Sequence, residues 1–552
     1  MSDDCLHCNG LSRSRLLHKA IAEAGRGLPA IEPGMPMPAG TGLSRRRFLA
    51  HGLGAALAVY GASRLGLSAF EEGIAAAASG APQKVLVSVF LEGGADGMSV
   101  LSPQGDPLYK KLRPTLALSG GTPLAEDGRL FWHPATSGIA QLYGEHKVTV
   151  MPAIGYTHPD QSHFTSRHYW EVGATSTQLN TGWLGRYLDA VGTLDNPLQG
   201  VSFDDSLAPT LATAKVPVAA ITAPDQYDFG SNRVWGEVEE RMLEAFGLFG
   251  GQATDPALHT AGNVAVQVDR LRRQLLPFRS ADGTSGIQSP VTYPKSSDPF
   301  PSKLAGLAAM LAANLPMRVV ALSAPGEYDT HSNEPGALAQ GLQLTSDSLL
   351  AFQRDLEARG IADRVLVHVW SEFGRRAQEN GSAGTDHGAA GTGFLIGTRV
   401  KGQMIGEFPG LQSGLDDDGN LVETADFRAV YAALLEQWLG VDAGRVIPGA
   451  SAFQRPGLIA GSSPRHRPRA CRWSRTSSPS CSRAGRSRRV RRSSSWPTTA
   501  RTRTTCGCSA SAARASTRGR PSCPAGTPTA STGCFPERMS SGAPSPTTAR
   551  AV

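Results

Sequence analysis

Four short apolar runs, rich in β-branched residues, recur along the chain, and polar or glycine-rich sequence follows each of them. They occupy residues 84–91, 147–153, 317–323 and 364–370 and read KVLVSVFL, KVTVMPA, MRVVALS and RVLVHVW. Apolar runs without polar alternation are typical of strands that are buried on both faces of a parallel sheet. The pattern therefore restricts the chain to folds built around a covered, mostly parallel sheet.

Helical patterns lie between the apolar runs. In residues 336–359 leucines recur at helical spacing, and Gly360 stands where such a helix would stop. Three more segments show helical patterns: 234–249, 303–314 and 425–439. Strands that alternate with helices predict an α/β fold, with a mostly parallel central sheet flanked by helices and right-handed crossovers. Residues 393–396 and 399–405 are expected to form a short antiparallel pair.

Carboxylates and imidazoles follow the predicted strands. Between residues 329 and 387 the chain carries DTH at 329–331, SEFGR at 371–375 and TDHG at 385–388. In parallel sheets ligands bind outside the carboxyl ends of the strands, so one surface is expected to gather these groups. Carboxylate oxygens combined with imidazole nitrogens suit zinc or manganese, with calcium and magnesium as alternatives. Two such ions can hold both the attacking and the leaving oxygen of an ester.

Each of these residues also has an ordinary structural explanation. An isolated Asp-x-His is often a loop pair satisfied by hydrogen bonds, and Glu372 can form a surface ion pair with Arg375 or Arg376. Ser162, which precedes His163, is equally well explained as a helix N-cap or as a nucleophile. Taken together and in order after strands, the motifs favour a metal-centred hydrolytic site.

Residues 1–81 have the features of a twin-arginine export signal. SRRRFL at 44–49 precedes a Gly/Ala/Leu-rich stretch at 52–67, and small residues suited to cleavage follow at 75–78. An amphipathic helix or a membrane anchor is the alternative, but the stretch is short and glycine-rich for a bilayer span. The twin-arginine translocation machinery is therefore the expected partner. The mature chain is expected in the periplasm, in the cell envelope or outside the cell.

Residues 461–552 differ in composition from the rest of the chain. They hold 18 Arg and one Glu but no Lys or Asp, a balance of +17, so residues 1–460 carry −10 within the whole-chain charge of +7. They also lack Leu, Ile, Asn, Gln and Tyr, and so cannot bury enough apolar surface to fold. One explanation is an Arg-rich disordered arm that binds polyanions. The other, which we favour because natural basic arms usually include Lys, is a frameshift in a GC-rich gene.

Residues 82–460 form the expected body, which is long enough for one large α/β domain. No cysteine stands between Cys8 and Cys471. The body therefore needs no disulfide and offers no thiolate to a metal. Since the basic excess belongs to the tail, no nucleic acid is expected to bind the folded body.

Five motifs of the body resemble those of the domain of unknown function 1501 family. They are EGGADG at 92–97, HPDQSHF at 158–164, EYDTH at 327–331, SEFGR at 371–375 and TDHG at 385–388. That family is exported, largely bacterial and biochemically uncharacterised. The resemblance implies membership of the alkaline phosphatase and sulfatase superfamily, with a mostly parallel sheet between helices and a metal site at the strand ends.

The resemblance also implies roles for single residues. Asp96 matches the superfamily's first metal ligand, which usually bridges to a second metal. Ser162 is similar in placement to the nucleophile, and His163 beside it is implied as a ligand or a base. Asp329 and His331 resemble the superfamily's Asp/His pair, although one residue separates them here instead of three.

Two registers are open for the last part of the motif series. In the first, Asp386 and His387 are the superfamily's adjacent Asp-His pair, and its final histidine is missing. In the second, which we prefer, residues 371–374 take the place of the usual Ser-Asp-His-Gly, so that His387 is the final histidine. The first metal would then have Asp329, His331 and His387 as ligands.

In this preferred register Asp96 and Glu372 remain for a second metal. That second site lacks a ligand because Phe373 replaces it, unless Asp386 or His163 supplies the missing group. We therefore expect one well-built metal position and leave the second open.

Two functional hypotheses follow. The first is an exported metal-dependent hydrolase of phosphate or sulfate esters, acting on a small-molecule or glycan ester, with Ser162 or water attacking and Arg167 or Arg375 holding an ester oxygen. The second is a non-catalytic, metal-stabilised binding or assembly protein of the envelope with the same fold. The sequence determines neither the substrate nor the oligomeric state.

Overall fold

The computed structural model describes residues 59–60, 83–193, 196–225, 227, 237–279 and 285–461. By its contacts the chain divides into two units, Met1–Pro468 and Arg469–Val552, and the second unit lies wholly outside the described residues. The twin-arginine motif and the Arg-rich tail also lie outside them, apart from the single tail residue Gly461. The boundaries expected at 81/82 and 460/461 stay predictions.

A nine-stranded, mostly parallel sheet forms the centre of the fold, in the order β1-β8-β7-β9-β2-β10-β13-β6-β14. All four predicted runs are confirmed as strands: β2 (Val85–Phe90), β6 (Val148–Gly155), β9 (Val319–Ser323) and β10 (Val365–Trp370). The others are β1 (Val59–Tyr60), β7 (Gly200–Ser202), β8 (Val218–Ala220), β13 (Gly391–Ile396) and β14 (Ala425–Asp426). β9, β2 and β10 are parallel neighbours, so their carboxyl ends lie at one edge.

β13 departs from the parallel plan. It lies between β10 and β6 and is antiparallel to both. The expected pairing of 393–396 with 399–405 is therefore wrong. In the described part of the chain, residues 399–405 make only isolated bridges, such as Val150 with Met404. β13 finds its partners in strands far away in sequence, which a local pattern does not indicate.

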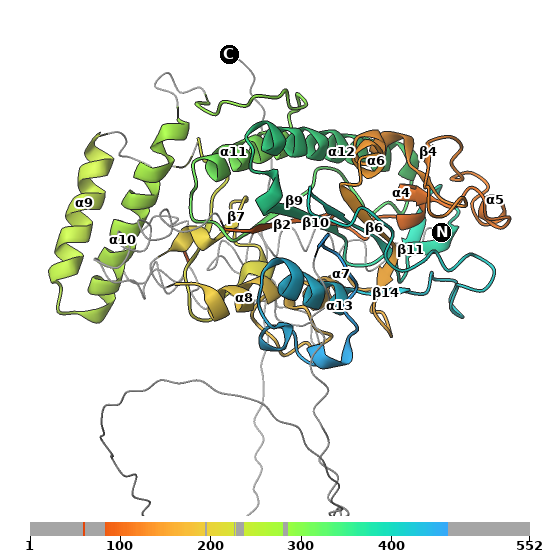
Figure 1. Ribbon diagram of the computed structural model, residues 1–552. Helices are drawn as coiled ribbons and strands as arrows, with labels where there is room; N and C mark the ends of the chain where they lie inside the picture. The colour runs from red at the N-terminus through yellow and green to blue at the C-terminus, as the bar shows by residue number, and fades with distance from the viewer. Residues whose placement is uncertain are drawn as a thin grey trace, which may run out of the picture. The chain divides into compact units, whose positions relative to one another are not determined.

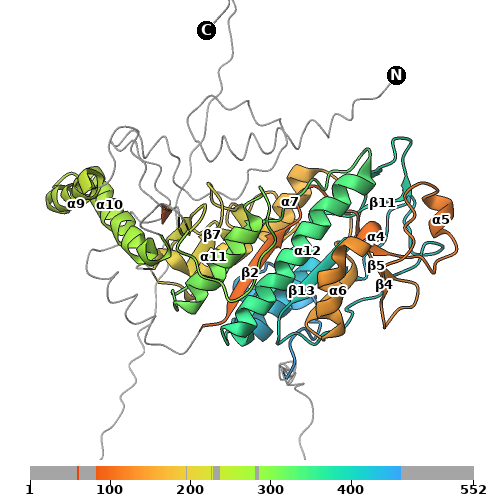
Figure 2. The same ribbon diagram turned by 90° about the horizontal axis from the view of Figure 1, so that it is seen from above.

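Different helices cover the two faces of the sheet (Figure 1). One face carries α6 (Ser137–Gly144), α11 (Phe300–Ala312) and α12 (Glu334–Ala358), and the other carries α7 (His163–Val172), α8 (Trp183–Val191) and α13 (Phe427–Ala433). Figure 2 shows α11, α12 and α6 side by side across the strands. Within β2, Val87 and Val89 belong to the core under the first group, whereas Leu86 belongs to the core under the second. The strand is thus buried on both faces, as its composition predicts.

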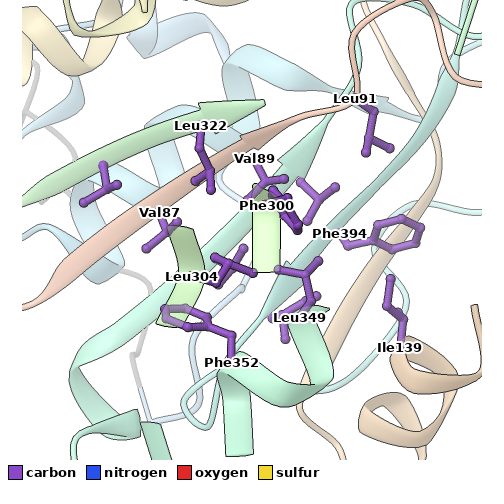
Figure 3. Packing of buried hydrophobic residues seen from close by; sticks show 14 of the residues in the cluster. Val87, Val89, Leu91, Ile139, Phe300, Leu304, Leu322, Leu349, Phe352 and Phe394 are labelled. Atoms are coloured by element: carbon purple, nitrogen blue, oxygen red, sulfur yellow. The ribbon is translucent and has the colours of Figure 1, made fainter. Parts of the chain in front are cut away.

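Figure 3 shows the core beneath α11 and α12. Phe300 and Leu304 of α11 and Leu349 and Phe352 of α12 pack against Val87 and Val89 of β2, and all six residues are at most 1% exposed. This packing holds both helices on the sheet and fixes the loop before α12, in which two of the predicted site residues lie.

An α-helical hairpin, α9 (Glu237–Gln252) and α10 (Pro256–Leu275), lies beside the sheet on the side of β7 (Figure 1). The helix predicted at 234–249 is confirmed as α9, while α10 had not been predicted. Short elements complete the described chain: α4 (Gly97–Val100), α5 (Tyr109–Leu112), β3 (Leu101–Ser102), β4 (Thr122–Pro123), β5 (Phe131–Trp132), β11 (Arg375–Glu379) and β12 (Thr385–His387). Within the described ranges no helix is both long and apolar enough to cross a membrane.

Candidate metal centre

Three separate segments bring imidazole and carboxylate groups together. His163 is the first residue of α7, Asp329 and His331 lie in the loop between β9 and α12, and His387 is the last residue of β12. One donor atom each of His163, Asp329 and His387 lie within 4.8 Å of one another, close enough to bind one metal ion. His331 is the nearest further imidazole, with its Nε2 3.1 Å from Asp329 Oδ1.

Two glycines after β2 allow these segments to approach. Gly93 has φ of +125° and Gly94 φ of +68°, a region that L side chains rarely adopt. A Cβ on Gly93 would lie 2.5 Å from the backbone nitrogen of Asp329, and a Cβ on Gly94 would lie 2.2 Å from Cε2 of Phe373. The ring of Phe373 in turn lies 4.8 Å from the ring of His163. The glycine pair thus lets the loop after β2 contact both sides of the site.

All three imidazoles approach the same carboxylate oxygen. Asp329 Oδ1 lies 3.5 Å from His163 Nε2, 3.1 Å from His331 Nε2 and 3.4 Å from His387 Nε2. Within the described chain, His163 Nε2 and His331 Nε2 are buried without a hydrogen-bond partner. Buried polar atoms are rarely left unpaired in native proteins, and a bound cation would satisfy both of them.

The opposite ring nitrogens are held by oxygen acceptors. His163 Nδ1 lies 2.8 Å from Glu372 Oε1, His331 Nδ1 3.2 Å from Asp386 Oδ1, and His387 Nδ1 2.9 Å from the backbone oxygen of Gln161. Because a carbonyl oxygen and an ionised carboxylate only accept hydrogen bonds, each Nδ1 must donate. In the neutral imidazole Nε2 then carries the lone pair, as a metal ligand requires.

Charges around the site separate the pKa values of its groups. Burial opposes ionisation of Asp329, but the neighbouring imidazoles of His163, His331 and His387 and the Arg375 charge hold its pKa well below the usual range. Burial also disfavours the charged form of His163, but Asp329 and Glu372 outweigh it and raise its pKa to about 9. His387 has no such second carboxylate, and burial lowers its pKa to about 4. Asp329 is therefore a permanent anion and His387 a neutral donor near pH 7.

The donor set fits a transition metal better than an alkaline-earth ion. Calcium and magnesium prefer oxygen ligands, whereas imidazole nitrogens with one carboxylate suit zinc and, among the alternatives, manganese. The two unpaired Nε2 atoms support the fit. His163, Asp329 and His387 are the residues that would hold the ion, with His331 within reach as a fourth donor.

Asp96 does not belong to this centre. It follows β2 as predicted, but its carboxylate is fully buried and accepts hydrogen bonds from both Nη1 and Nη2 of Arg113. Burial opposes its ionisation, and the Arg113 charge overrides that effect and lowers the pKa of Asp96 to about 2. In this structure Asp96 thus pairs with a guanidinium and lies apart from the imidazole cluster, and its expected role as a metal ligand stays a prediction.

Glu372 and Asp386 lie behind the imidazoles. Glu372 accepts hydrogen bonds from His163 Nδ1, from the backbone N–H of Gly93 and from the hydroxyl of Ser371. Asp386 contacts the Nδ1 of His331. In this structure the two carboxylates therefore contact the imidazoles from behind, and their expected roles as metal ligands stay predictions. The pair expected for a second ion, Asp96 with Glu372, is divided between two hydrogen-bond networks.

Arg375, which is expected to hold an ester oxygen, makes its hydrogen bonds in this structure to oxygens of the protein. Its side chain is buried and donates to the backbone oxygens of Gly93, Gly94, Tyr328 and Thr385 and, at 2.6 Å, to Asp329 Oδ1. It therefore joins the glycine turn, the Asp329 loop and β12, and its expected contact with an ester oxygen stays a prediction. Its role is to position Asp329.

Ser162 caps α7 only through its backbone. Its side chain makes no capping hydrogen bond, while its N–H donates to Asp160 Oδ1 at 2.8 Å. The hydroxyl therefore stands at the N-terminus of α7, beside His163, and is not engaged as a cap. Its nucleophilic role stays a prediction.

Sequence reasoning missed the orienting contacts. Gln161 acts through its backbone oxygen, which no residue type reveals. Arg113 had not been singled out, although it takes Asp96 away from the centre. The available signal for Gln161 was its place in HPDQSHF, the motif at the start of α7.

Fold and site together define a class: an α/β protein with a buried cluster of imidazoles around one carboxylate at the carboxyl ends of a mostly parallel sheet. Residues 158–451 match the family model described as a protein of unknown function, DUF1501. The chain belongs to this family. No curated protein matches its sequence.

Solved structures with a similar arrangement are distant. The lipoteichoic acid synthase LtaP from Listeria monocytogenes has 10% identity and a TM-score of 0.29, with 67% of this chain and 75% of that chain covered. A protein in the alkaline phosphatase superfamily from Vibrio parahaemolyticus has 11% identity and a TM-score of 0.29, with 75% and 80% covered. The C-terminal periplasmic domain of EptC from Escherichia coli, in complex with Zn, has 10% identity and a TM-score of 0.29, with 69% and 93% covered. Likeness at this level says nothing about the activity of this chain.

Proposed function

We propose that this protein is an exported, metal-dependent hydrolase of phosphate or sulfate esters. The observation that carries the proposal is the convergence of His163, Asp329 and His387 on one point, with an unpaired buried Nε2 on His163. The cluster lies where α/β sheets bind their ligands, outside the carboxyl ends of the strands. A divalent ion held by these groups supplies a Lewis acid for an ester oxygen.

The protein's own residues orient the imidazoles of the centre and present a hydroxyl beside them. Glu372 and the backbone oxygen of Gln161 fix the tautomers of His163 and His387, so that both Nε2 atoms can bind. Ser162 presents a hydroxyl at the N-terminus of α7, where the helix dipole stabilises negative charge. The superfamily resemblance found in the sequence motifs supports Ser162 as the nucleophile.

Elemental analysis and an ester panel test the proposal together. The purified protein should hold one zinc or manganese ion per chain and hydrolyse at least one member of a panel of phosphate monoesters, phosphate diesters and sulfate esters. His387→Ala should abolish turnover together with metal binding, and Ser162→Ala should abolish turnover alone. Ser296→Ala, whose hydroxyl accepts from a backbone N–H in an exposed loop, serves as the control. A metal-loaded protein that is inactive on the whole panel would refute the hydrolase.

A non-catalytic metal-stabilised envelope protein is the second candidate, and one observation favours it. Three arginines near the centre are already paired with carboxylates: Arg113 with Asp96, Arg167 with Glu92 and Glu171, and Arg375 with Asp329. The charge of each of these guanidiniums is thus already balanced by a carboxylate before any anionic ester binds. If metal raises the melting temperature but vanadate and sulfate do not bind in a calorimeter, this candidate is the better one.

Export by the twin-arginine route is part of the proposal. The motif at 44–49 supports it, and the absence of cysteine from 9–470 is compatible with folding before export. Replacing Arg45 and Arg46 together by Lys should leave the protein in the cytoplasm of an expressing bacterium. Unchanged appearance in the periplasm or the medium would refute this route.

A further inference from the structure

We infer that the centre has three fixed donors, His163, Asp329 and His387, and one exchangeable donor, His331, which leaves the ion when a ligand enters. The inference rests on the metal centre of the proposed function. Four protein donors lie within reach of the ion, so one of them must leave before a substrate can bind to it. Catalytic zinc sites keep one position open, whereas structural sites close all four with protein.

The fixed donors are enclosed and firmly oriented. The side chain of His163 is 2% exposed and bonded to Glu372, which is 0% exposed. Its ring lies 4.8 Å from the ring of Phe373 and 4.4 Å from that of His387. His387 is anchored to a backbone oxygen, and Asp329 to the buried Arg375. None of these side chains can rotate away without breaking a buried or partly buried hydrogen bond.

His331 is held much less firmly. Its side chain is 20% exposed, and its Nδ1 meets Asp386, whose side chain is 56% exposed, at 3.2 Å. Asp386 itself is steadied by Asn380 Nδ2 at the same distance of 3.2 Å. An exposed pair of this kind contributes little to holding a ring in place, because water competes for both partners.

The side chain of His331 can change its conformation, whereas the backbone at this position is held by hydrogen bonds. The backbone oxygen of His331 accepts a hydrogen bond from Asn380 at 2.9 Å, and the preceding Thr330 is buried and donates to Glu334. The movement required is therefore a change of rotamer at a fixed backbone, which exposed side chains make rapidly.

Metal affinity of single variants separates fixed from exchangeable donors. Affinity for Zn²⁺ is measured by competition with a chromophoric chelator in wild type, His331→Ala, His163→Ala and His387→Ala. We expect His331→Ala to lose about tenfold or less, and the other two about a hundredfold or more. A glutamine at 163 or 387 repeats the measurement if alanine unfolds the chain, which the melting temperature without metal reveals.

Added imidazole gives a second, independent measurement. In the Co²⁺-loaded His331→Ala protein, imidazole should bind from solvent and restore the wild-type visible spectrum, because the vacated space is open. In His163→Ala it should not, because that space is enclosed. Wild type loaded with Co²⁺ should also change spectrum with imidazole as His331 is displaced.

The outcomes distinguish the inference from the proposed function. If His331→Ala loses as much affinity as His163→Ala, or imidazole leaves the wild-type spectrum unchanged, His331 is a fixed ligand and the inference fails while the metal centre stands. If wild type binds neither Zn²⁺ nor Co²⁺, the proposed function and the inference fail together.

Discussion

Replacing Glu372 by Gln tests the orienting carboxylate of the centre. The substitution keeps the shape of a side chain that is 0% exposed and leaves an oxygen 2.8 Å from His163 Nδ1, but it removes the negative charge. A hydrogen bond to a charged group contributes about 1.5–3 kcal/mol and a neutral one about 0.5–1.5 kcal/mol. The exchange should therefore weaken the hold on His163 by roughly 1–2 kcal/mol.

Other contacts of Glu372 add to this loss. The backbone N–H of Gly93 donates to both carboxylate oxygens, at 3.1 and 3.2 Å, so the amide group of Gln would place N–H against N–H. Orienting partners of metal-bound imidazoles are generally worth about 10–100-fold in affinity. We expect Zn²⁺ affinity to fall in that range, which corresponds to about 1.4–2.8 kcal/mol.

Chelator competition at constant pH measures the effect, with Glu92→Gln as the matched control. Glu92 also follows β2, but its carboxylate pairs with Arg167 and contacts no imidazole of the centre. The control should keep wild-type affinity to within about twofold. Equal affinities of wild type and Glu372→Gln would refute the reasoning, since His163 would then not depend on Glu372 for its orientation.

Three further predictions concern stability. Burial and the Asp96 charge raise the pKa of Glu334 from 4.5 to about 8, so the folded state keeps a proton that the unfolded state has lost. The stability this contributes is complete below about pH 4.5 and lost as the pH rises through about 8, and Glu334→Gln should remove a slope of about 1.4 kcal/mol per pH unit in urea unfolding across that window. In Arg375→Lys the lysine cannot supply the hydrogen bonds to four backbone oxygens and Asp329, so the free energy of unfolding, measured in urea, should fall by about 3–5 kcal/mol. A loss below about 1 kcal/mol would contradict the positioning role of Arg375. Phe352→Ala, in the core of Figure 3, should cost about 3–5 kcal/mol, while Phe249→Ala on α9, 75% exposed, should stay within about 0.5 kcal/mol, and comparable losses would refute the burial argument.

The strands of the sheet were predictable because their composition is local information. β2 and β10 are buried on both faces, and a run without polar alternation signals this directly. β13 was not placed, because its antiparallel position depends on β10 and β6 and not on its own residues. Pairing between distant strands is the part of a sheet that local pattern leaves open.

The residues of the site were predictable, but several of their roles were not. Asp329 and His387 follow from residue type and order, since imidazole and carboxylate after strands are unusual. The motif order predicts Glu372 as a metal ligand, whereas in the structure its carboxylate lies behind His163 and contacts the Nδ1 of that ring. The prediction for Asp96 rests on its match to the superfamily's first metal ligand, and its contact with Arg113 was not foreseen because Arg113 carries no signal of its own in the sequence. The residue types that bind an ion directly are the same as those that orient its ligands. Only the distances in the structure distinguish the two roles.

The wide spacing of the donors along the chain has a consequence for how the ion is acquired. Asp329 and His387 are 58 residues apart, and the contact that orients His387 to Gln161 spans 226 residues. Closing loops of such length costs entropy that packing of the sheet must first offset, so an ion cannot nucleate the folding of this chain as zinc does in small zinc-binding domains. An ion bound at this centre would therefore enter a finished fold, and the metals available to the folded chain would decide which ion it binds.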